Sequence, residues 1–383
     1  MNDFINEIDS NFFLTGKKSV NNTSWFSGNI TAYNAVRNSV LISELSHYGM
    51  VKIAGEDSWR VLNYIISADI SLIRDEQLLY TLLLDSNGDI VLDAYVVCEN
   101  ESYYLITEWL TGNELCDFIN NIILKSSDFI DCFHIETIQS MNDRWKMICV
   151  EGPYAWEVLS EIIGMDVIGL PFHEFMSIDN DLFLMRVGKH GEYCYYLIGT
   201  EEKLENAWND ISRLNKKYNI AIGDVNYLKD IRLENPVWDK GLFDNFSKCP
   251  VELQLQWAIN YDKDNFLGKE KISERSDNGV NKKFIGAEIV ENENLNITSG
   301  DFVFYKNKKI GIVIESGKSL FLDKYIVKLL LDTKYAYVGV NNYFIKTNNG
   351  DVNIKTKSMP FINNVSLAVN PTEHSYLQKN IEI

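Results

Sequence analysis

The chain has 383 residues, a length that suits two or three domains and leaves ample room for a hydrophobic core. Its 54 acidic and 36 basic residues give a formal charge of −18, which repels nucleic acid and anionic membrane, so neither is an expected partner. No basic, apolar leader and no run of apolar residues long enough to span a membrane occurs, so we expect a cytoplasmic protein.

The first segments in chain order contain an internal duplication. Residues 51–62 and 148–159 each read as an apolar strand, a glycine turn and a helix. Gly55 and Gly152 coincide at an offset of 97 residues, and a Trp, a Val and a Leu coincide at the same offset. The repeat predicts two copies of one structural unit.

A strand-rich hairpin follows in each copy, over 78–107 and 183–199, and each copy then ends in an amphipathic helix. The apolar positions at helical spacing are Leu115, Phe118, Ile119 and Ile122 in the first copy, and Leu204, Ala207, Trp208, Ile211 and Leu214 in the second. The order β-α-β-β-α-β is that of a ferredoxin-like module. We therefore predict an α+β fold, with a catalytic body over 1–275 made of two interleaved modules, approximately 1–140 and 141–275.

The first hairpin carries a carboxylate inside an apolar strand. The pair Asn87-Gly88 predicts a type I′ turn, and the run Ile90–Val97 after it is apolar except for Asp93. A carboxylate buried without a partner costs about 2 kcal/mol or more, so Asp93 either faces water at the strand edge or has a chemical task. The hairpin alone leaves both interpretations open.

From Lys282 onward the pattern becomes all-β, with short apolar runs separated by glycine and asparagine turns. The strand-like runs are 284–290, 302–305, 309–315, 325–331 and 343–346. No helical periodicity intervenes. We predict a small C-terminal barrel or sandwich, and we assign 276–383 to a β-barrel domain.

The cysteines and histidines show no spacing typical of a metal site. The six cysteines contain no C-x-x-C pair and the five histidines no H-x-x-x-H pair. Four of the cysteines lie in strand-like apolar runs, where a thiol usually behaves as a small hydrophobe. We expect no metal site.

Taken in order, several motifs resemble the aminomethyltransferase family, whose type member is the T protein of the glycine cleavage system. The run 87–93 is similar to the family's catalytic turn, and Asp93 falls on its catalytic aspartate. Further similar stretches are Ser46-His47-Tyr48-Gly49, Glu151-Gly152-Pro153, 186–192, Ile231-Arg232-Leu233-Glu234, Pro250-Val251-Glu252, 266–269, 311–317 and Pro360-Phe361. The resemblance implies a three-part cloverleaf around a central channel that holds tetrahydrofolate.

The same resemblance implies an activity and a set of site residues. The expected enzyme transfers a one-carbon unit, methyl or aminomethyl-derived, between a small-molecule substrate and tetrahydrofolate, with Asp93 stabilising charge. The residues expected to contact the cofactor are Tyr80, Lys189, Glu192, Tyr196 and Trp257. A carrier-protein partner is compatible with the resemblance but has no support of its own in this sequence.

Some family contacts are missing from this chain. Tyr196 stands where the family has a carboxylate that grips the pterin, Leu228 stands for an arginine, and no arginine follows Arg275. These departures favour an alternative, a folate-independent enzyme of specialised metabolism that reuses the pocket and Asp93 on another small molecule. A non-catalytic folate-binding relative in iron–sulfur assembly ranks last, because its Lys-Gly-Cys-Tyr-x-Gly-Gln-Glu motif is absent.

Overall fold

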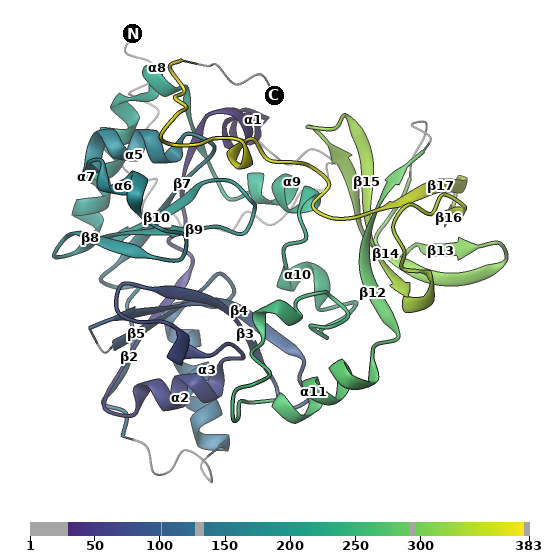
Figure 1. Ribbon diagram of the computed structural model, residues 1–383, viewed down its shortest axis with the longest axis horizontal. Coiled ribbons are helices and arrows are strands. Elements are labelled where there is room, and N and C mark those ends of the chain that lie inside the picture. The colour runs from purple at the N-terminus through teal and green to yellow at the C-terminus, as the bar shows by residue number, and fades with distance from the viewer. Residues whose placement is uncertain (1–29, 101, 127–133, 291–295, 379–383) are drawn as a thin grey trace.

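The computed structural model describes residues 30–100, 102–126, 134–290 and 296–378. These residues form two β-sheets with their helices and one closed β-barrel, which give the molecule three lobes (Figure 1). The N-terminal stretch and Cys132, both considered above, lie outside the described residues. Among the described helices, none has the length and apolar character needed to cross a membrane.

The first module is a five-stranded sheet in the order β3-β4-β5-β2-β6. Its elements are β2 (Gly49–Ala54), α2 (Ser58–Ile65), η1 (Ile70–Leu72), β3 (Leu78–Leu84), β4 (Ile90–Glu99), β5 (Ser102–Thr107), α3 (Gly112–Lys125) and β6 (Thr137–Ser140). Helix α3 begins with a capping box, in which Thr111 and Glu114 satisfy each other's backbone amides. It buries the predicted Leu115, Ile119 and Ile122 against the sheet.

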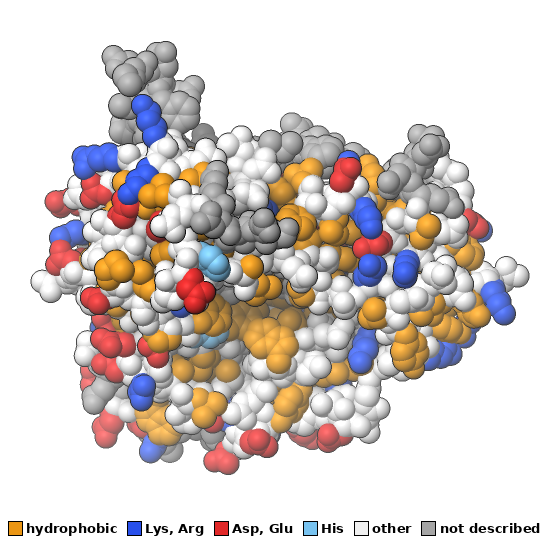
Figure 2. All heavy atoms as spheres, turned by 45° about the horizontal axis from the view of Figure 1, so that its top comes forward, with side chains coloured by type: hydrophobic (Ala, Val, Ile, Leu, Met, Phe, Trp, Pro, Cys, Tyr) orange, Lys and Arg blue, Asp and Glu red, His pale blue; other side chains and the backbone are white. Residues whose placement is uncertain are grey.

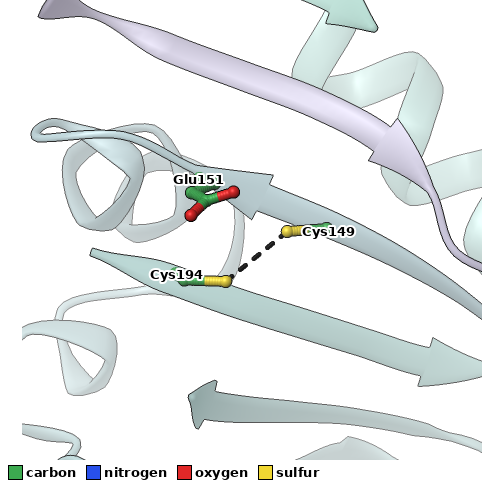
Figure 3. Close-up of side chains that lie close together, drawn as sticks. All are labelled: Cys149, Glu151 and Cys194. Carbon is green, nitrogen blue, oxygen red and sulfur yellow. Dashed lines mark hydrogen bonds between the residues drawn. The ribbon is translucent and has the colours of Figure 1, made fainter. Parts of the chain in front are cut away.

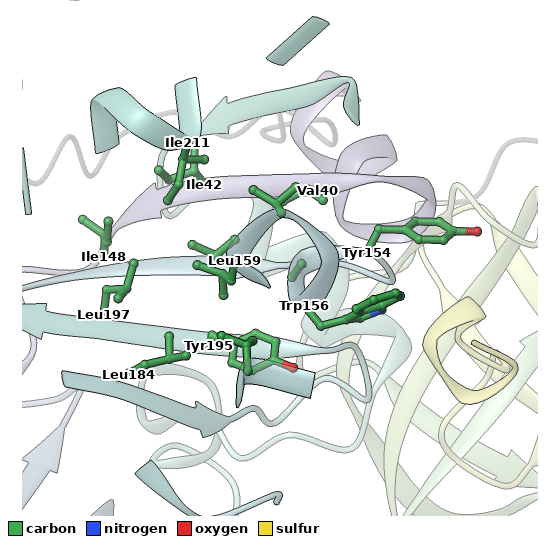
Figure 4. Packing of buried hydrophobic residues seen from close by; sticks show 14 of the residues in the cluster. Val40, Ile42, Ile148, Tyr154, Trp156, Leu159, Leu184, Tyr195, Leu197 and Ile211 are labelled. Carbon is green, nitrogen blue, oxygen red and sulfur yellow. The ribbon is translucent and has the colours of Figure 1, made fainter. Parts of the chain in front are cut away.

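The second module is a six-stranded sheet in the order β11-β1-β7-β10-β9-β8. Its elements are α1 (Ile30–Asn38), β1 (Val40–Glu44), β7 (Lys146–Glu151), α5 (Ala155–Ile163), α6 (Asp166–Gly169), β8 (Phe175–Asp179), β9 (Leu182–Val187), β10 (Cys194–Gly199), α7 (Glu201–Arg213), α8 (Asn215–Tyr218) and β11 (Ile220–Gly223). Trp156 and Leu159 of α5 pack over Ile148 and Leu197 of the sheet (Figure 4). This apolar layer is the core of the module.

The predicted duplication is present in the backbone. Gly55 and Gly152 have φ of +129° and +132°, a conformation that favours glycine. A Cβ atom would lie 2.6 Å from the Glu136 amide nitrogen at the first position, and 2.5 Å from the Ser39 carbonyl oxygen at the second. Each glycine therefore lets the strand-to-helix turn pass close to neighbouring backbone.

The α+β fold class is confirmed, and the structure adds two features to the predicted order. Each module has three strands between its two main helices, where the plain ferredoxin-like order has two. In addition, β1 belongs to the second sheet, where it pairs antiparallel with β7 and parallel with β11. The N-terminal strand thus crosses the division placed near residue 140.

The C-terminal lobe is a closed barrel in the order β12-β15-β14-β13-β16-β17. Its strands are β12 (Lys282–Ile289), β13 (Phe302–Tyr305), β14 (Lys308–Ser319), β15 (Lys324–Asp332), β16 (Tyr343–Thr347) and β17 (Gly350–Lys357), with η3 (Thr333–Tyr335) after β15. The sequence predicted all of these strands except β17, whose inward positions alternate with polar ones. Because β17 pairs with β12, it closes the barrel.

Two connections join the barrel to the modules. The first contains α9 (Tyr227–Glu234), α10 (Lys240–Phe243), η2 (Gln256–Ala258) and α11 (Lys269–Asn278). The second follows β17, passes η4 (Val365–Leu367) and runs back to the second module, as the yellow segment in Figure 1 shows. Val365 and Val369 pack into that module's core, so this segment of 276–383 is not part of the barrel.

The hairpin turn after β3 differs from the prediction. Gly88 has φ +75°, but Asn87 is not among the residues with positive φ, so the turn is not type I′. The Asp85 amide donates to the Asp89 carbonyl at 2.9 Å, and the Asp85 carboxylate accepts from the Asn87 amide at 2.8 Å. The Asp85 side chain therefore caps a longer turn that needs only one left-handed residue.

Candidate functional site

A cavity of about 530 Å³ lies where the two modules meet the barrel and its connection. Figure 2 shows a hollow on this face of the molecule with hydrophobic side chains gathered in it. The lining residues used below are Tyr80, Tyr95, His173, Lys189, Trp238, Gln254, Trp257, Lys283, Lys357 and Ser358. A volume of this size, with mostly apolar walls and a few polar groups, is typical of small-molecule sites.

Asp93 lies directly behind the wall of this cavity and is fully buried. Its neighbour Leu92 packs into the core under the helices of the first module, so strand alternation turns Asp93 to the opposite face. The carboxylate accepts hydrogen bonds from Tyr80 Oη at 2.7 Å, Trp109 Nε1 at 2.6 Å and Lys189 Nζ at 2.5 Å. Asp93 is therefore a paired internal charge and not an exposed edge carboxylate.

Lys189 brings its ammonium group into a cage made by the first module. Nζ forms the ion pair with Asp93 and lies 5.3 Å and 5.8 Å from the ring centroids of Tyr80 and Tyr95. A carboxylate and two aromatic faces are the groups that stabilise a cation. The side chain keeps 12% of its surface exposed, so Lys189 is the charged member of the pair that lines the cavity.

A stack of two aromatic rings forms one side of the cavity. Trp257 lies on Tyr80 with ring centroids 5.3 Å apart and an angle of 21° between the planes. Trp257 is 67% exposed, and both residues line the cavity. The stack offers a flat aromatic surface to a ligand ring.

Trp109 is held in place by a second set of charges. The guanidinium of Arg232 lies 5.8 Å from the Trp109 ring centroid and pairs with Glu108 at 2.5 Å and Asp239 at 3.1 Å. Because Trp109 Nε1 donates to Asp93, these contacts fix the carboxylate from behind. No sequence motif identified Trp109 as part of the site.

The charges on the cavity wall are basic, in contrast with the acidic chain as a whole. Lys189, Lys283 and Lys357 line the cavity, and no Asp or Glu of the described residues does. Lys357 pairs with Glu288 at 3.1 Å, behind the wall. The remaining polar groups include the amide of Gln254, so the surface suits a ligand with an anionic group.

Glu192 and Tyr196, both expected to contact a cofactor, do not line the cavity. Glu192 is buried against Arg37 at 2.6 Å and accepts a hydrogen bond from Ser366 at 2.5 Å, in the returning C-terminal segment. Burial raises the pKa of Glu192 to about 7, although Arg37 opposes this. The ion pair therefore ties α1, the second module and the C-terminal segment together.

Tyr196 lies one layer behind the cavity. It is buried between the two sheets, with its ring edge-on to Tyr95 at 6.4 Å and to Tyr48 at 6.1 Å. Tyr95 is the member of this cluster that lines the cavity. Among the predicted cofactor contacts, the structure thus brings Tyr80, Lys189 and Trp257 together around Asp93.

Two thiols meet deeper in the second module. Cys149 Sγ and Cys194 Sγ are 3.5 Å apart on neighbouring strands, close to Glu151 (Figure 3). The Glu151 carboxylate already accepts from His190 at 2.9 Å and Tyr227 at 3.0 Å, and burial raises the pKa of both thiols. Through its contact with His190, the buried Glu151 carboxylate therefore anchors the bend that carries Lys189 and His190.

Comparison with known proteins agrees with this architecture. The sequence profile of the GCVT N-terminal domain family matches residues 4–263. The aminomethyltransferase of Alkaliphilus oremlandii is 26% identical over 339 residues, which is 85% of this chain and 88% of that protein. The aminomethyltransferase of Caldanaerobacter subterraneus subsp. tengcongensis is 26% identical over 323 residues, 82% and 83% of the two chains.

The fold also matches a solved structure. The glycine cleavage system aminomethyltransferase T from Bartonella henselae superposes with a TM-score of 0.72 and 19% identity, over 86% of this chain and 88% of that chain. Because the family profile covers more than half of the sequence, this chain belongs to the GCVT N-terminal domain family. The expected resemblance and the expectation of a transferase of this type are thereby confirmed.

Proposed function

We propose that the protein is an enzyme that transfers a one-carbon unit between a small-molecule substrate and tetrahydrofolate in the 530 Å³ cavity. The observation that carries this proposal is the buried Asp93 carboxylate, which is held at the cavity wall by Tyr80, Trp109 and Lys189. It occupies the position that the family resemblance implies for the catalytic aspartate. At that position its charge acts by fixed electrostatics and not by covalent chemistry.

Several cavity residues fit a flat, anionic cofactor of this kind. The stack of Trp257 on Tyr80 suits the face of a heterocycle, and Lys283 and Lys357 suit a carboxylate tail. Gln254 supplies the amide among the polar groups of the wall. Tetrahydrofolate, when bound, supplies the nitrogen that carries the one-carbon unit.

In this proposal the residues of the chain have separate tasks. Lys189 presents its ammonium to the ligand, while Asp93 fixes that ammonium and balances its charge. A cation that develops on the substrate competes with the Lys189 ammonium for the Asp93 carboxylate. Asp93 therefore stabilises that cation only as far as Lys189 moves away from the carboxylate. The Tyr80 hydroxyl donates to the same carboxylate oxygen, Oδ2, as Lys189, so it also helps to hold the charge of Asp93 in place.

A second candidate is a folate-independent enzyme that binds another anionic small molecule in the same cavity. The observation that favours it is the absence of any Asp or Glu among the described residues that line the cavity. A carboxylate is the acceptor that best holds the paired N–H groups of a pterin. Glu192 is the carboxylate that the sequence placed among the cofactor contacts, but in the structure it forms a buried ion pair with Arg37.

Calorimetric titration with tetrahydrofolate separates the two candidates. The first requires a dissociation constant of about 100 µM or tighter. Trp257→Ala should weaken binding about tenfold by removing the stack, whereas Trp59→Ala, a partly exposed tryptophan outside the cavity, should not. No heat at about 1 mM tetrahydrofolate would reject the first candidate in favour of the second.

A further inference from the structure

His173 has a backbone conformation that is uncommon in residues other than glycine. Its φ is +66°, in the left-handed region that glycine occupies freely. Hydrogen bonds fix the segment on both sides, because the His173 amide donates to the Arg186 carbonyl at 2.9 Å and its carbonyl accepts from Leu78 at 2.9 Å. The segment therefore joins the first strand of one module's hairpin to the second module, with a strained residue at the junction.

The imidazole of His173 is held by rings and lines the cavity. It stacks on Phe172 with centroids 4.0 Å apart and meets the edge of Tyr95 at 5.9 Å. No described residue makes a hydrogen bond to either of its nitrogens, in contrast to His190, whose Nδ1 contacts Glu151. Ring contacts with Phe172 and Tyr95 therefore orient the imidazole. Its two nitrogens make no hydrogen bond to the described residues and can bind a ligand in the cavity.

The chemistry of a neutral imidazole complements the rest of the wall. The charged groups there, Lys189, Lys283 and Lys357, are donors only, whereas a neutral imidazole also has one acceptor nitrogen. Burial lowers the pKa of His173 to about 4, so the acceptor is present at neutral pH. The cavity then offers a hydrogen-bond acceptor beside the ring of Tyr95.

We propose that His173 is a ligand-binding residue, whose imidazole accepts a hydrogen bond from an N–H or O–H group of the molecule bound in the cavity. The assignment rests on the proposed function and adds to it a requirement on the ligand, which must carry a proton donor beside its anionic group. The backbone conformation fits this role, because residues held at a positive φ gather at ligand sites, where the surrounding structure fixes them.

The test is His173→Gly, with Glu76→Gly as a matched control. Glu76 has the same φ of +66°, lies at the same junction, and is exposed outside the cavity, so both variants replace a residue at positive φ with glycine. We expect both melting temperatures within about 3 °C of wild type. His173→Gly should weaken tetrahydrofolate binding about tenfold or more, and Glu76→Gly less than about twofold.

A spectroscopic readout accompanies the binding data. With ¹⁵N-labelled histidine, the resonance missing from His173→Gly identifies the imidazole, and that resonance should shift when tetrahydrofolate is added to wild type. Binding within about twofold of wild type in His173→Gly would overturn the assignment. If His173→Gly unfolds, an unmoved resonance in wild type overturns it and a shifted one supports it. Failure of wild type to bind tetrahydrofolate would overturn the proposed function, and this assignment with it.

Discussion

Removal of the charge on Asp93 should leave the ammonium of Lys189 without its counter-ion. Asp93 is fully buried and accepts three hydrogen bonds, of 2.5 to 2.7 Å, so Asp93→Asn keeps the shape of the side chain but loses one acceptor oxygen and the charge. Removing one partner of a buried ion pair costs about 3–5 kcal/mol. Because the Lys189 side chain retains 12% exposure toward the cavity, we expect a loss in the lower part of this range, about 3–4 kcal/mol.

A double-mutant cycle isolates the pair. Lys189→Met keeps an unbranched chain between the rings of Tyr80 and Tyr95 but leaves the Asp93 carboxylate with two neutral donors. The double variant removes both charges, so its loss should be smaller than the sum of the single losses by about 1–3 kcal/mol. Urea unfolding of all four proteins measures this difference, and Asp93→Asn should also lower turnover about 100-fold or more.

An exposed ion pair serves as the control. Lys271 and Glu274 are 3.2 Å apart on α11 and more than half exposed, so the cycle of Lys271→Met and Glu274→Gln should give less than about 0.5 kcal/mol. If the loss in free energy of unfolding of the double variant at Asp93 and Lys189 equals the sum of the two single losses within about 0.5 kcal/mol, the two residues are not coupled as a buried pair. Turnover of Asp93→Asn within a few-fold of wild type would refute Asp93 as the charge on which the reaction depends.

Two further predictions concern Tyr196 and Lys263. Tyr196→Glu places an unpaired carboxylate between the sheets, so it should cost about 3 kcal/mol or more and give no gain in tetrahydrofolate affinity, while Tyr196→Phe stays within about 1 kcal/mol in urea unfolding. Tighter tetrahydrofolate binding by Tyr196→Glu would contradict the placement of this residue behind the cavity. Burial lowers the pKa of Lys263 to about 7, whereas an unfolded chain titrates near pH ~10.4, so between these values the unfolded state binds more protons. From about pH 7 to about pH 10, the free energy of unfolding of wild type should therefore rise relative to that of Lys263→Met, and equal slopes of the two in urea unfolding would reject the shift.

Local features of the fold could be read from the sequence because they depend on neighbours along the chain. The apolar spacing of α3 and the positive φ of the glycine turns at positions 55 and 152 each reflect a constraint within a few residues, and the structure has them as predicted. The turn at Asn87 is the local feature predicted wrongly, because the side chain of Asp85 provided hydrogen bonds that the Asn-Gly pair does not signal.

The order of motifs along the chain determined the family and the α+β class with its C-terminal barrel, and it identified Asp93, Tyr80, Lys189 and Trp257 as neighbours of one site. Only the tertiary structure decided what Asp93 contacts. Lys189 is 96 residues away and Trp109 lies past the next strand, and both positions follow from how the modules pack. Strand alternation fixes which face a side chain is on, but not what covers that face.

The same reason separates Glu192 from the site. In the sequence it stands three residues from Lys189, yet Arg37 and the returning C-terminal segment engage it on the side away from the cavity. His173 had no sequence signal, because its strain arises only where the two modules exchange backbone hydrogen bonds. A sequence specifies residues and local geometry, whereas the burial and pairing of charges depend on segments that meet only in the folded chain.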